Sequence, residues 1–236
     1  MSAVQVGAGD DATALPGWLR PLAEAGRNVR ATQLSRFLPP RDSAPRPASV
    51  LMLFGTGSDG PQVLLLERSH DLRSHAGQVA FPGGAQDPVD GGAVEAALRE
   101  AEEETGLDPA GVQVIGVLPR LWLRPSNYAV TPVLAWWRAP CAVRVVDPAE
   151  TASVHTVTVS ELLDPANRVT VRHPSGFRGP AFCVRDLIVW GFTAGLLSRM
   201  FALAGWERVW DESRVLELPS ELAASSMRDL AEGEID

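Results

Sequence analysis

The segment from Ala97 to Leu107 places four glutamates in five consecutive residues: Glu100, Glu102, Glu103 and Glu104. On a helix, Glu100, Glu103 and Glu104 share one narrow arc, whereas Glu102 points to nearly the opposite side. Acids at these spacings repel one another, and the C-terminal end of a helix dipole disfavours them further. A divalent cation would reverse both penalties, and carboxylate oxygens suit Mg²⁺ or Mn²⁺. The spacing predicts a metal site, with a solvated acidic face as the alternative.

A helix that starts near Gly92 and ends at Gly106 should carry these acids, because glycine suits the left-handed position that closes a helix. An apolar stripe lies beside the acidic one and consists of Val94, Leu98, Ala101 and Thr105. This pattern predicts a helix that packs on a sheet and presents its acids along one edge.

The stretch FPGGAQDPVDGGAVEAALREAEEETGL resembles the box of the Nudix hydrolases. The second half of the box matches at Arg99, Glu100, Ala101, Glu103, Glu104, Gly106 and Leu107. The first half departs, because the chain from Gly84 to Arg99 is one residue longer than the pattern and lacks its isolated glutamate. Asp87 and Asp90 are the two candidates to replace that acid as the partner of Arg99.

A second motif precedes the box in LLLERSHDLRSHAGQVAFPGG, from Leu64 to Gly84. It resembles the signature of the coenzyme A pyrophosphatase branch of the Nudix enzymes, and Leu66 stands where that signature has threonine. The matching positions are Leu64, Leu65, Arg68, Ser69, Arg73, Gly77 and FPGG. The resemblance extends from about Val50 to Leu203.

The resemblance implies an α/β (α+β) fold, a Nudix-type sandwich in which a mixed β-sheet is flanked by helices and the box forms a loop-helix-loop unit. It implies metal-dependent hydrolysis of coenzyme A or acyl-coenzyme A to 3',5'-ADP and (acyl-)4'-phosphopantetheine. Mg²⁺ or Mn²⁺ would be held by Glu100, Glu103, Glu104 and the carbonyl of Gly84, with Arg99 completing the catalytic set. The expected substrate contacts are Arg68, Ser69, Arg73, Gly77, Phe81 and Gly83.

Three questions stay open at this point. The substrate could instead be ADP-ribose, a dinucleotide cofactor or a nucleoside triphosphate, since only the upstream motif favours coenzyme A. A catalytically silent binding module is the alternative from a different class of protein. The glutamate that accepts the proton is not identified. Glu150, at the start of a predicted strand, is expected to be solvated, although related enzymes sometimes place an extra acid on a loop that faces the metals.

The chain divides into three parts. Residues 1–47, rich in Gly, Pro, Asp and Arg, form a predicted N-terminal extension with one short amphipathic piece. Residues 48–205 form the predicted catalytic domain, and 206–236 a C-terminal segment with a frayed acidic tail. Apolar β-type runs occur at 50–54, 63–66, 78–81, 112–118, 129–137 and 154–159, followed by a short strand pair and a second helix over 185–203.

Composition narrows the partners. The formal net charge of the 236 residues is -8, and all 21 basic residues are Arg, so nucleic acid is not an expected partner. Arg forks still suit small phosphorylated ligands. The most apolar segment, Leu187 to Leu197, is shorter than the roughly 20 residues of a membrane span. Two cysteines without metal or redox spacing and the lack of a secretory pattern predict the cytoplasm.

Overall fold

A computed structural model describes residues 15–35, 44–123 and 126–232 of the chain. Its main sheet is mixed, because β1 (Arg46–Gly57) runs parallel to β7 (Tyr128–Trp137) and antiparallel to β2 (Gly60–Arg68). The other strands of this sheet are β3 (Val79–Ala80), β4 (Gly83–Ala85), β5 (Val112–Val117), β6 (Leu121–Leu123) and β8 (Thr151–Thr158). The strand order is β3-β2-β1-β7-β5, with β8 also paired to β2. All six predicted β-type runs are therefore confirmed as strands, with shifts at their ends.

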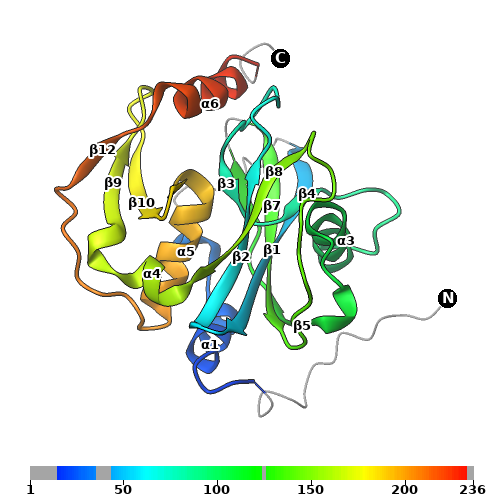
Figure 1. The fold of residues 1–236 in the computed structure, drawn as a ribbon. Coiled ribbons are helices and arrows are strands. Elements are labelled where there is room, and N and C mark those ends of the chain that lie inside the picture. The colour runs from blue at the N-terminus through cyan, green and yellow to red at the C-terminus, as the bar shows by residue number, and fades with distance from the viewer. Residues whose placement is uncertain (1–14, 36–43, 124–125, 233–236) are drawn as a thin grey trace.

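A second, smaller sheet lies beside the first (Figure 1). It contains β9 (Arg168–Arg172), β10 (Arg178–Val184), β11 (Leu187–Val189) and β12 (Val215–Glu217), in the order β11-β10-β9-β12. The sequence predicted only the pair β9 and β10. The strand β12 is contributed by residues far along the chain and runs parallel to β9, a pairing that no local pattern announces.

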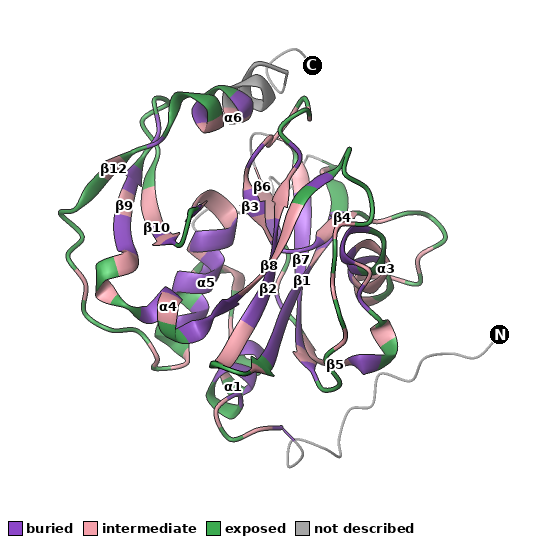
Figure 2. Ribbon diagram, in the orientation of Figure 1, coloured by how far each residue is buried: buried purple, intermediate pink, exposed green. Residues whose placement is uncertain are grey.

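Helices cover both faces of the main sheet, which confirms the predicted sandwich. The helix α3 (Ala93–Thr105) packs its Ala97 and Ala101 against Leu51, Leu53 and Val133 of the strands. It ends at Gly106, whose φ of 67° is the left-handed closure expected there. On the opposite face, α5 (Gly191–Leu203) buries its middle part, from Thr193 to Phe201, except for the exposed Arg199 and the half-buried Gly195 (Figure 2). No helix in the described ranges combines the length and apolarity of a membrane span.

Part of the predicted N-terminal extension belongs to the core. The helices α1 (Arg20–Asn28) and α2 (Ala31–Leu34) pack on the side of α5, and their Leu22 and Leu34 join the larger hydrophobic cluster. Residues 1–14 and 36–43 of the predicted extension lie outside the described residues, and its last two residues begin strand β1. Residues 15–35 therefore act as a structural layer of the folded domain.

The second predicted helix begins later than expected. The sequence predicted a helix from Arg185, but Leu187–Val189 form strand β11, and α5 starts at Gly191. Arg185 adopts a left-handed turn with φ 54°, which folds β11 back onto β10 as a hairpin. The β-branched Ile188 and Val189 suit that extended pairing better than a helix.

The predicted frayed tail is wrong for its described part, because residues 220–232 form helix α6 (Ser220–Glu232). Ala223 is buried in a small cluster with Val171 and Ala181 of the second sheet. Alanine and leucine are strong helix formers, and docking on the sheet supplies the stability that an isolated helix of this length lacks.

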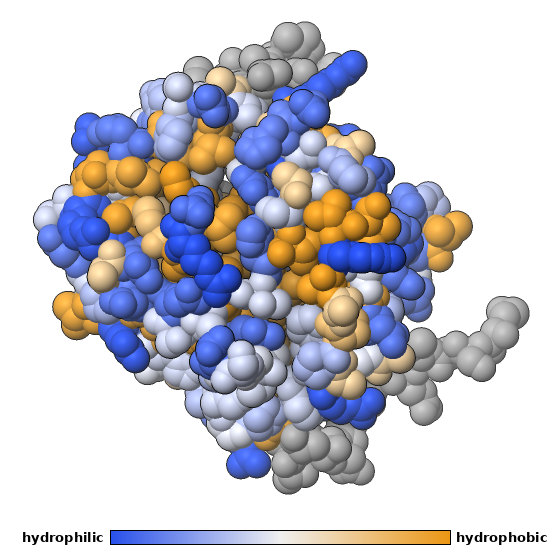
Figure 3. Space-filling view, viewed as in Figure 1, coloured by the Kyte–Doolittle hydropathy of each residue, from blue (hydrophilic) through white to orange (hydrophobic). Residues whose placement is uncertain are grey.

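The surface of the protein carries a broad apolar area in the view of Figure 3. Apolar side chains gather over the main sheet beside α3, whereas most of the margin is hydrophilic (Figure 3).

A short helix, α4 (Val159–Leu163), joins the two sheets through a charged contact. Thr158 and Glu161 form a capping box at its start, and Arg185 donates to both oxygens of Glu161 at 3.0 Å. The hydrogen bond from Arg185 lowers the pKa of Glu161 to about 2. The ion pair therefore stabilises the fold above the ordinary carboxyl pKa, and this contribution disappears as the pH falls from about 4.5 to about 2.

We expect Glu161→Gln to lower the melting temperature slightly at pH 7, by a free energy below about 1 kcal/mol because the pair is partly exposed. Glutamine keeps an acceptor for the Thr158 backbone, so the change isolates the charge. Thermal unfolding of both proteins across pH should show the difference shrinking from pH 5 to pH 2. A difference that stays constant with pH would assign the loss to capping.

Candidate active site

The loop before α3 contacts the last acid of the helix through its backbone. The amide of Gly83 donates to Oε2 of Glu104 at 2.9 Å, and only 4% of Glu104 is exposed. Gly83 has a φ of 154°, and a Cβ there would collide with the backbone of Ser49 and Val50 in β1. Glycine is thus needed at 83 so that the loop can lie between β1 and the buried carboxylate.

The next residue of the loop lies against a second acid. A Cβ on Gly84 would collide with the carboxylate of Glu100, so the two groups are in close contact only because 84 is glycine. Strand β4 holds Gly84 in place opposite Ser49 of β1. The backbone of Gly84 and the carboxylates of Glu100 and Glu104 therefore form one cluster at the end of α3.

The electrostatics of this cluster suit a cation. Burial raises the pKa of Glu104 to about 7, against opposing contributions from the Gly83 amide and Arg68, and burial also raises the pKa of Glu100. The negative charge of Glu150 on a neighbouring loop raises both pKa values further. Carboxylates held out of water close to one another lack full compensation in the protein alone, and a divalent cation would supply it.

Arg99 joins the loop to the helix. Its Nε and one terminal nitrogen donate to Asp90 at 3.0 and 3.1 Å, whereas Asp87 is 3.8 Å away, so Asp90 is the main acidic partner. Arg99 also donates to the carbonyl of Ala85 at 3.2 Å. The hydrogen bond from Arg99 lowers the pKa of Asp90, which keeps this partner ionised. The structure thus resolves the alternative that the sequence left open.

The same guanidinium joins the third acid, Glu103, to Glu100. One nitrogen of Arg99 lies 2.9 Å from Glu103 and 3.0 Å from Glu100, and the Glu103 side chain is 58% exposed. Among the described residues, no group of three acidic, His or Cys side chains converges closely enough to hold a metal. Glu100 and Glu104 lie on the loop side of the helix, and Glu103 lies at the exposed edge of the cluster, bound to Arg99.

The predicted substrate residues are placed in different environments. Arg68 lies at the end of β2 with one terminal nitrogen 3.8 Å from Glu104, so the upstream motif meets the box directly. Arg73 is exposed on the loop that follows. Ser69 is buried, and its amide donates to the carbonyl of Glu150 at 2.9 Å.

Two of the predicted substrate residues, Gly77 and Phe81, are closely packed against other parts of the protein. Gly77 has a φ of 67°, and a Cβ there would approach His70 and Leu222 of α6. Phe81 is 2% exposed and belongs to the core cluster that α5 covers. The Phe81 side chain therefore packs in the core, which contradicts the predicted substrate contact for that side chain.

Glu150 lies near the acids, in line with the alternative that the family resemblance offered to a solvated residue. It is exposed, as expected, but its charge acts on both Glu100 and Glu104. The pairing of β8 with β2 brings this loop to the site, over a sequence separation that no motif spans.

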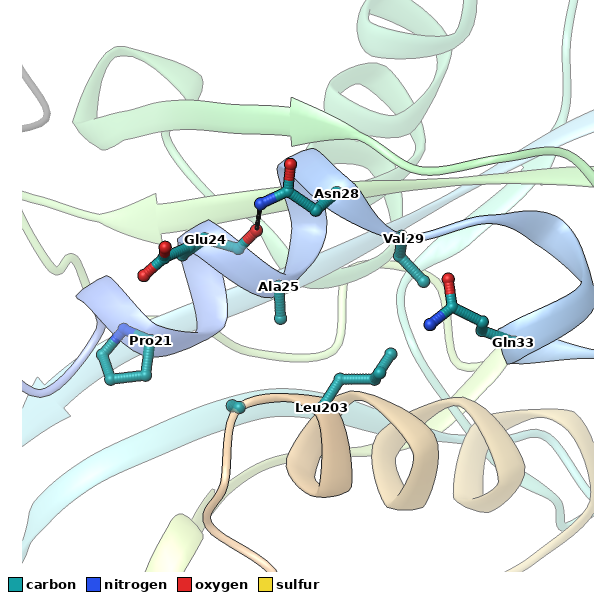
Figure 4. A pocket seen from close by; sticks show the side chains of 8 residues that line it. Pro21, Glu24, Ala25, Asn28, Val29, Gln33 and Leu203 are labelled. Atoms are coloured by element: carbon teal, nitrogen blue, oxygen red, sulfur yellow. Dashed lines mark hydrogen bonds between the residues drawn. The ribbon is translucent and has the colours of Figure 1, made fainter.

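A pocket of about 330 Å³ lies elsewhere, between α1, α2 and the end of α5 (Figure 4). Its lining includes Pro21, Val29, Gln33 and Leu203, and Asn28 of the lining donates to the carbonyl of Glu24 along α1 at 3.1 Å. None of the predicted site residues lines it.

Comparison with known proteins gives concordant results. The NUDIX domain model matches residues 45–175. The uncharacterized Nudix hydrolase NudL of Escherichia coli is 40% identical over 147 residues, covering 59% of this chain and 73% of NudL, and its Shigella boydii counterpart is 39% identical over the same length. Among solved structures, the Nudix hydrolase RenU of M. Smegmatis superposes with a TM-score of 0.50 at 19% identity, covering 71% of this chain and 90% of RenU.

Proposed function

Because the chain belongs to the Nudix hydrolase family, which cleaves diphosphate bonds, we propose that it hydrolyses coenzyme A or acyl-coenzyme A with Mg²⁺ or Mn²⁺. The products would be 3',5'-ADP and (acyl-)4'-phosphopantetheine. The supporting observation is the contact of Arg68, from the upstream motif, with Glu104 of the box. A cationic side chain beside the metal-binding acids suits a substrate whose diphosphate lies on the metal.

The carboxylates of Glu100 and Glu104, with the Gly84 carbonyl, would hold the metal, and Glu103 would complete the set after leaving Arg99. When bound, such an ion neutralises diphosphate charge and lowers the pKa of a coordinated water. Burial keeps Glu104 from being fully ionised near pH 7 in the free protein. The hydrogen bond from the Gly83 amide fixes the Glu104 carboxylate beside the loop.

Arg99 acts as a positioning residue in this proposal. Its bonds to Asp90 and Ala85 fix the loop on α3, while its contact with Glu103 and Glu100 orients two of the proposed ligands. Because Nε and both terminal nitrogens of Arg99 already contact these protein groups, we do not assign Arg99 a direct contact with the substrate.

We further propose a cytoplasmic location, which is supported by two free cysteines, Cys141 and Cys183.

The substrate is tested by a screen of purified protein against coenzyme A, dephospho-coenzyme A, ADP-ribose, dinucleotide cofactors and nucleoside triphosphates. Each is assayed with Mg²⁺ or Mn²⁺ and with a chelator. Metal-dependent release of 3',5'-ADP with the highest kcat/KM for coenzyme A is the expected result. Turnover confined to another diphosphate would reject the branch, and lack of any metal-dependent turnover would favour a binding module.

We expect millimolar Mg²⁺ or Mn²⁺ to raise the melting temperature, because a cation that binds only the folded cluster stabilises it by mass action. Differential scanning calorimetry with and without chelator measures the shift. The control is buffer without divalent metal, brought to equal ionic strength with NaCl, which measures the stabilisation that comes only from screening of the acidic surface charges. Equal shifts with NaCl and with divalent metal would support the solvated-face alternative.

A further inference from the structure

Three buried polar atoms without a hydrogen-bond partner lie together at the end of β2. They are Nε2 of Gln78, Nε of Arg68 and Oγ1 of Thr151, and they are three of seven such side-chain atoms in the described part of the chain. Buried polar groups are nearly always paired, so three orphan groups at one place indicate a missing partner. Thr151 is only 1% exposed.

Strand pairing places the three residues in one row. Arg68 is the register partner of Thr151 in the antiparallel pair of β2 with β8, and the Arg68 amide donates to the carbonyl of Gln78 at 3.0 Å. Directly opposed residues of antiparallel strands have their side chains on the same face of the sheet. Arg68 is thus the central residue of the row, with Gln78 on one side and Thr151 on the other.

The row lies on the same face of the sheet as the metal-binding acids. Val79 packs into the core that α5 covers, so strand alternation directs the neighbouring Gln78 to the opposite face. Arg68 reaches Glu104 of α3, which lies on that opposite face. The orphan atoms therefore lie on the face of the sheet that carries the buried acid, and Arg68 links them to it.

The chemistry of the row is that of an anion site. The Oε1 atom of Gln78 is engaged with Nδ1 of His75 at 3.1 Å, which leaves the amide nitrogen as the available group. The amide NH₂, the guanidinium N–H and the hydroxyl can all donate, and two of the three cannot accept. An oxyanion that receives these hydrogen bonds would satisfy all three groups at once.

We infer that Gln78 and Thr151, together with Arg68, form a phosphate-binding site that holds one phosphate group of the metal-bound diphosphate. This inference rests on the proposed function for the identity of the substrate, but the anion site itself can be tested without turnover. It adds two specificity residues to the upstream motif, one of them from β8, far outside the motif in sequence.

The test uses methylene diphosphonate, a non-hydrolysable diphosphate, titrated into the full chain with Mg²⁺ by calorimetry. Thr151→Val removes the hydroxyl at nearly constant shape, and Gln78→Glu replaces the amide donor by a repelling carboxylate. We expect each change to weaken binding by about tenfold or more, the loss typical of a hydrogen bond to a charged group. Thr151→Ser should restore binding.

Stability separates this role from a structural one. Since the Thr151 hydroxyl has no protein partner, Thr151→Val should leave the melting temperature of the ligand-free protein unchanged or raise it. Thr156→Val, on the same strand and face but opposite Leu64, is the matched control and should change neither stability nor binding appreciably.

Unchanged diphosphonate affinity in folded Thr151→Val and Gln78→Glu would overturn the inference and mark the row as a hydrated pocket. If wild-type protein fails to hydrolyse coenzyme A while both variants still weaken diphosphonate binding, the proposed substrate fails and the phosphate site stands. If coenzyme A is hydrolysed equally well by wild type and both variants, the site fails and the proposed function stands.

Discussion

Glu104→Gln should lower kcat/KM by at least about 10²-fold, the scale expected when part of a metal-centred electrostatic stabilisation is lost. Glutamine can still accept the hydrogen bond from the Gly83 amide, which measures 2.9 Å in the structure, so the loop should keep its position. The variant loses the negative charge that would hold the cation. Steady-state kinetics at saturating Mg²⁺ measure the effect.

The same substitution should stabilise the metal-free protein, and the gain should depend on pH. The folded-state pKa of Glu104 is raised from 4.5 to about 7 by burial, so wild-type stability falls as the pH rises through that window. The gain should therefore be absent below about pH 4.5 and complete above about pH 7. Thermal unfolding with chelator across this range provides the measurement.

Glu103→Gln should also remove most activity, although its starting position differs. Glu103 is largely exposed and bonded to Arg99, so its substitution should change stability little. Glu102→Gln is the matched control for both variants, because Glu102 is an exposed neighbour on the other side of the helix. Full turnover in both the Glu103 and the Glu104 variant would reject the metal assignment.

The helix and its acidic stripe could be predicted because both depend on local spacing. The different environments of the acids could not, since helical periodicity places Glu103 and Glu104 in the same arc. The structure buries Glu104 because the Gly83 amide reaches it, and exposes Glu103 because Arg99 binds it at the surface. The contact of Gly83 with Glu104 depends on how the preceding loop returns to the helix, which the spacing of residues in α3 does not encode. Arg99 and Glu103, by contrast, are four residues apart on the helix itself.

The sequence could not decide between Asp87 and Asp90 as the partner of Arg99, and the reason again lies in the loop before the helix. The loop between Gly84 and the helix is longer than the family pattern, so counting positions could not identify the partner of Arg99. In the structure, Asp90 also accepts from the backbone amide of Asp87 at 2.7 Å, a turn that aims its carboxylate at the guanidinium. Loop geometry of this kind depends on backbone turns.

Long-range pairing explains the remaining errors. Helix α6 and strand β12 form because they dock on β9, more than forty residues earlier in the chain, and the three residues of β12 are too few to signal that pairing. The loop with Glu150 and the side chain of Thr151 reach the site through the pairing of β8 with β2. Residues that act on the site from another strand carry no spacing signal in the sequence.

The last prediction separates the two arginines of the upstream motif. Arg68 lies beside Glu104, at the diphosphate end of the site, whereas Arg73 is exposed on the loop beyond it. Arg68→Ala should therefore raise KM for every diphosphate substrate, by about 10- to 100-fold for loss of a charge-assisted hydrogen bond. Arg73→Ala should raise KM by a similar factor only for substrates that carry a 3'-phosphate.

Dephospho-coenzyme A is the discriminating substrate, because it lacks that phosphate and retains the rest of coenzyme A. If Arg73 binds the 3'-phosphate, the penalty of Arg73→Ala should largely vanish on dephospho-coenzyme A, while that of Arg68→Ala persists. In both variants kcat should change less than KM, since a contact made equally in the ground and transition states affects binding alone. A wild-type preference for ADP-ribose over coenzyme A by about tenfold or more, equal to roughly 1.4 kcal/mol, would reject the coenzyme A assignment whatever the variants do. The upstream motif would then serve to position Arg68 and the FPGG loop beside the acids of α3.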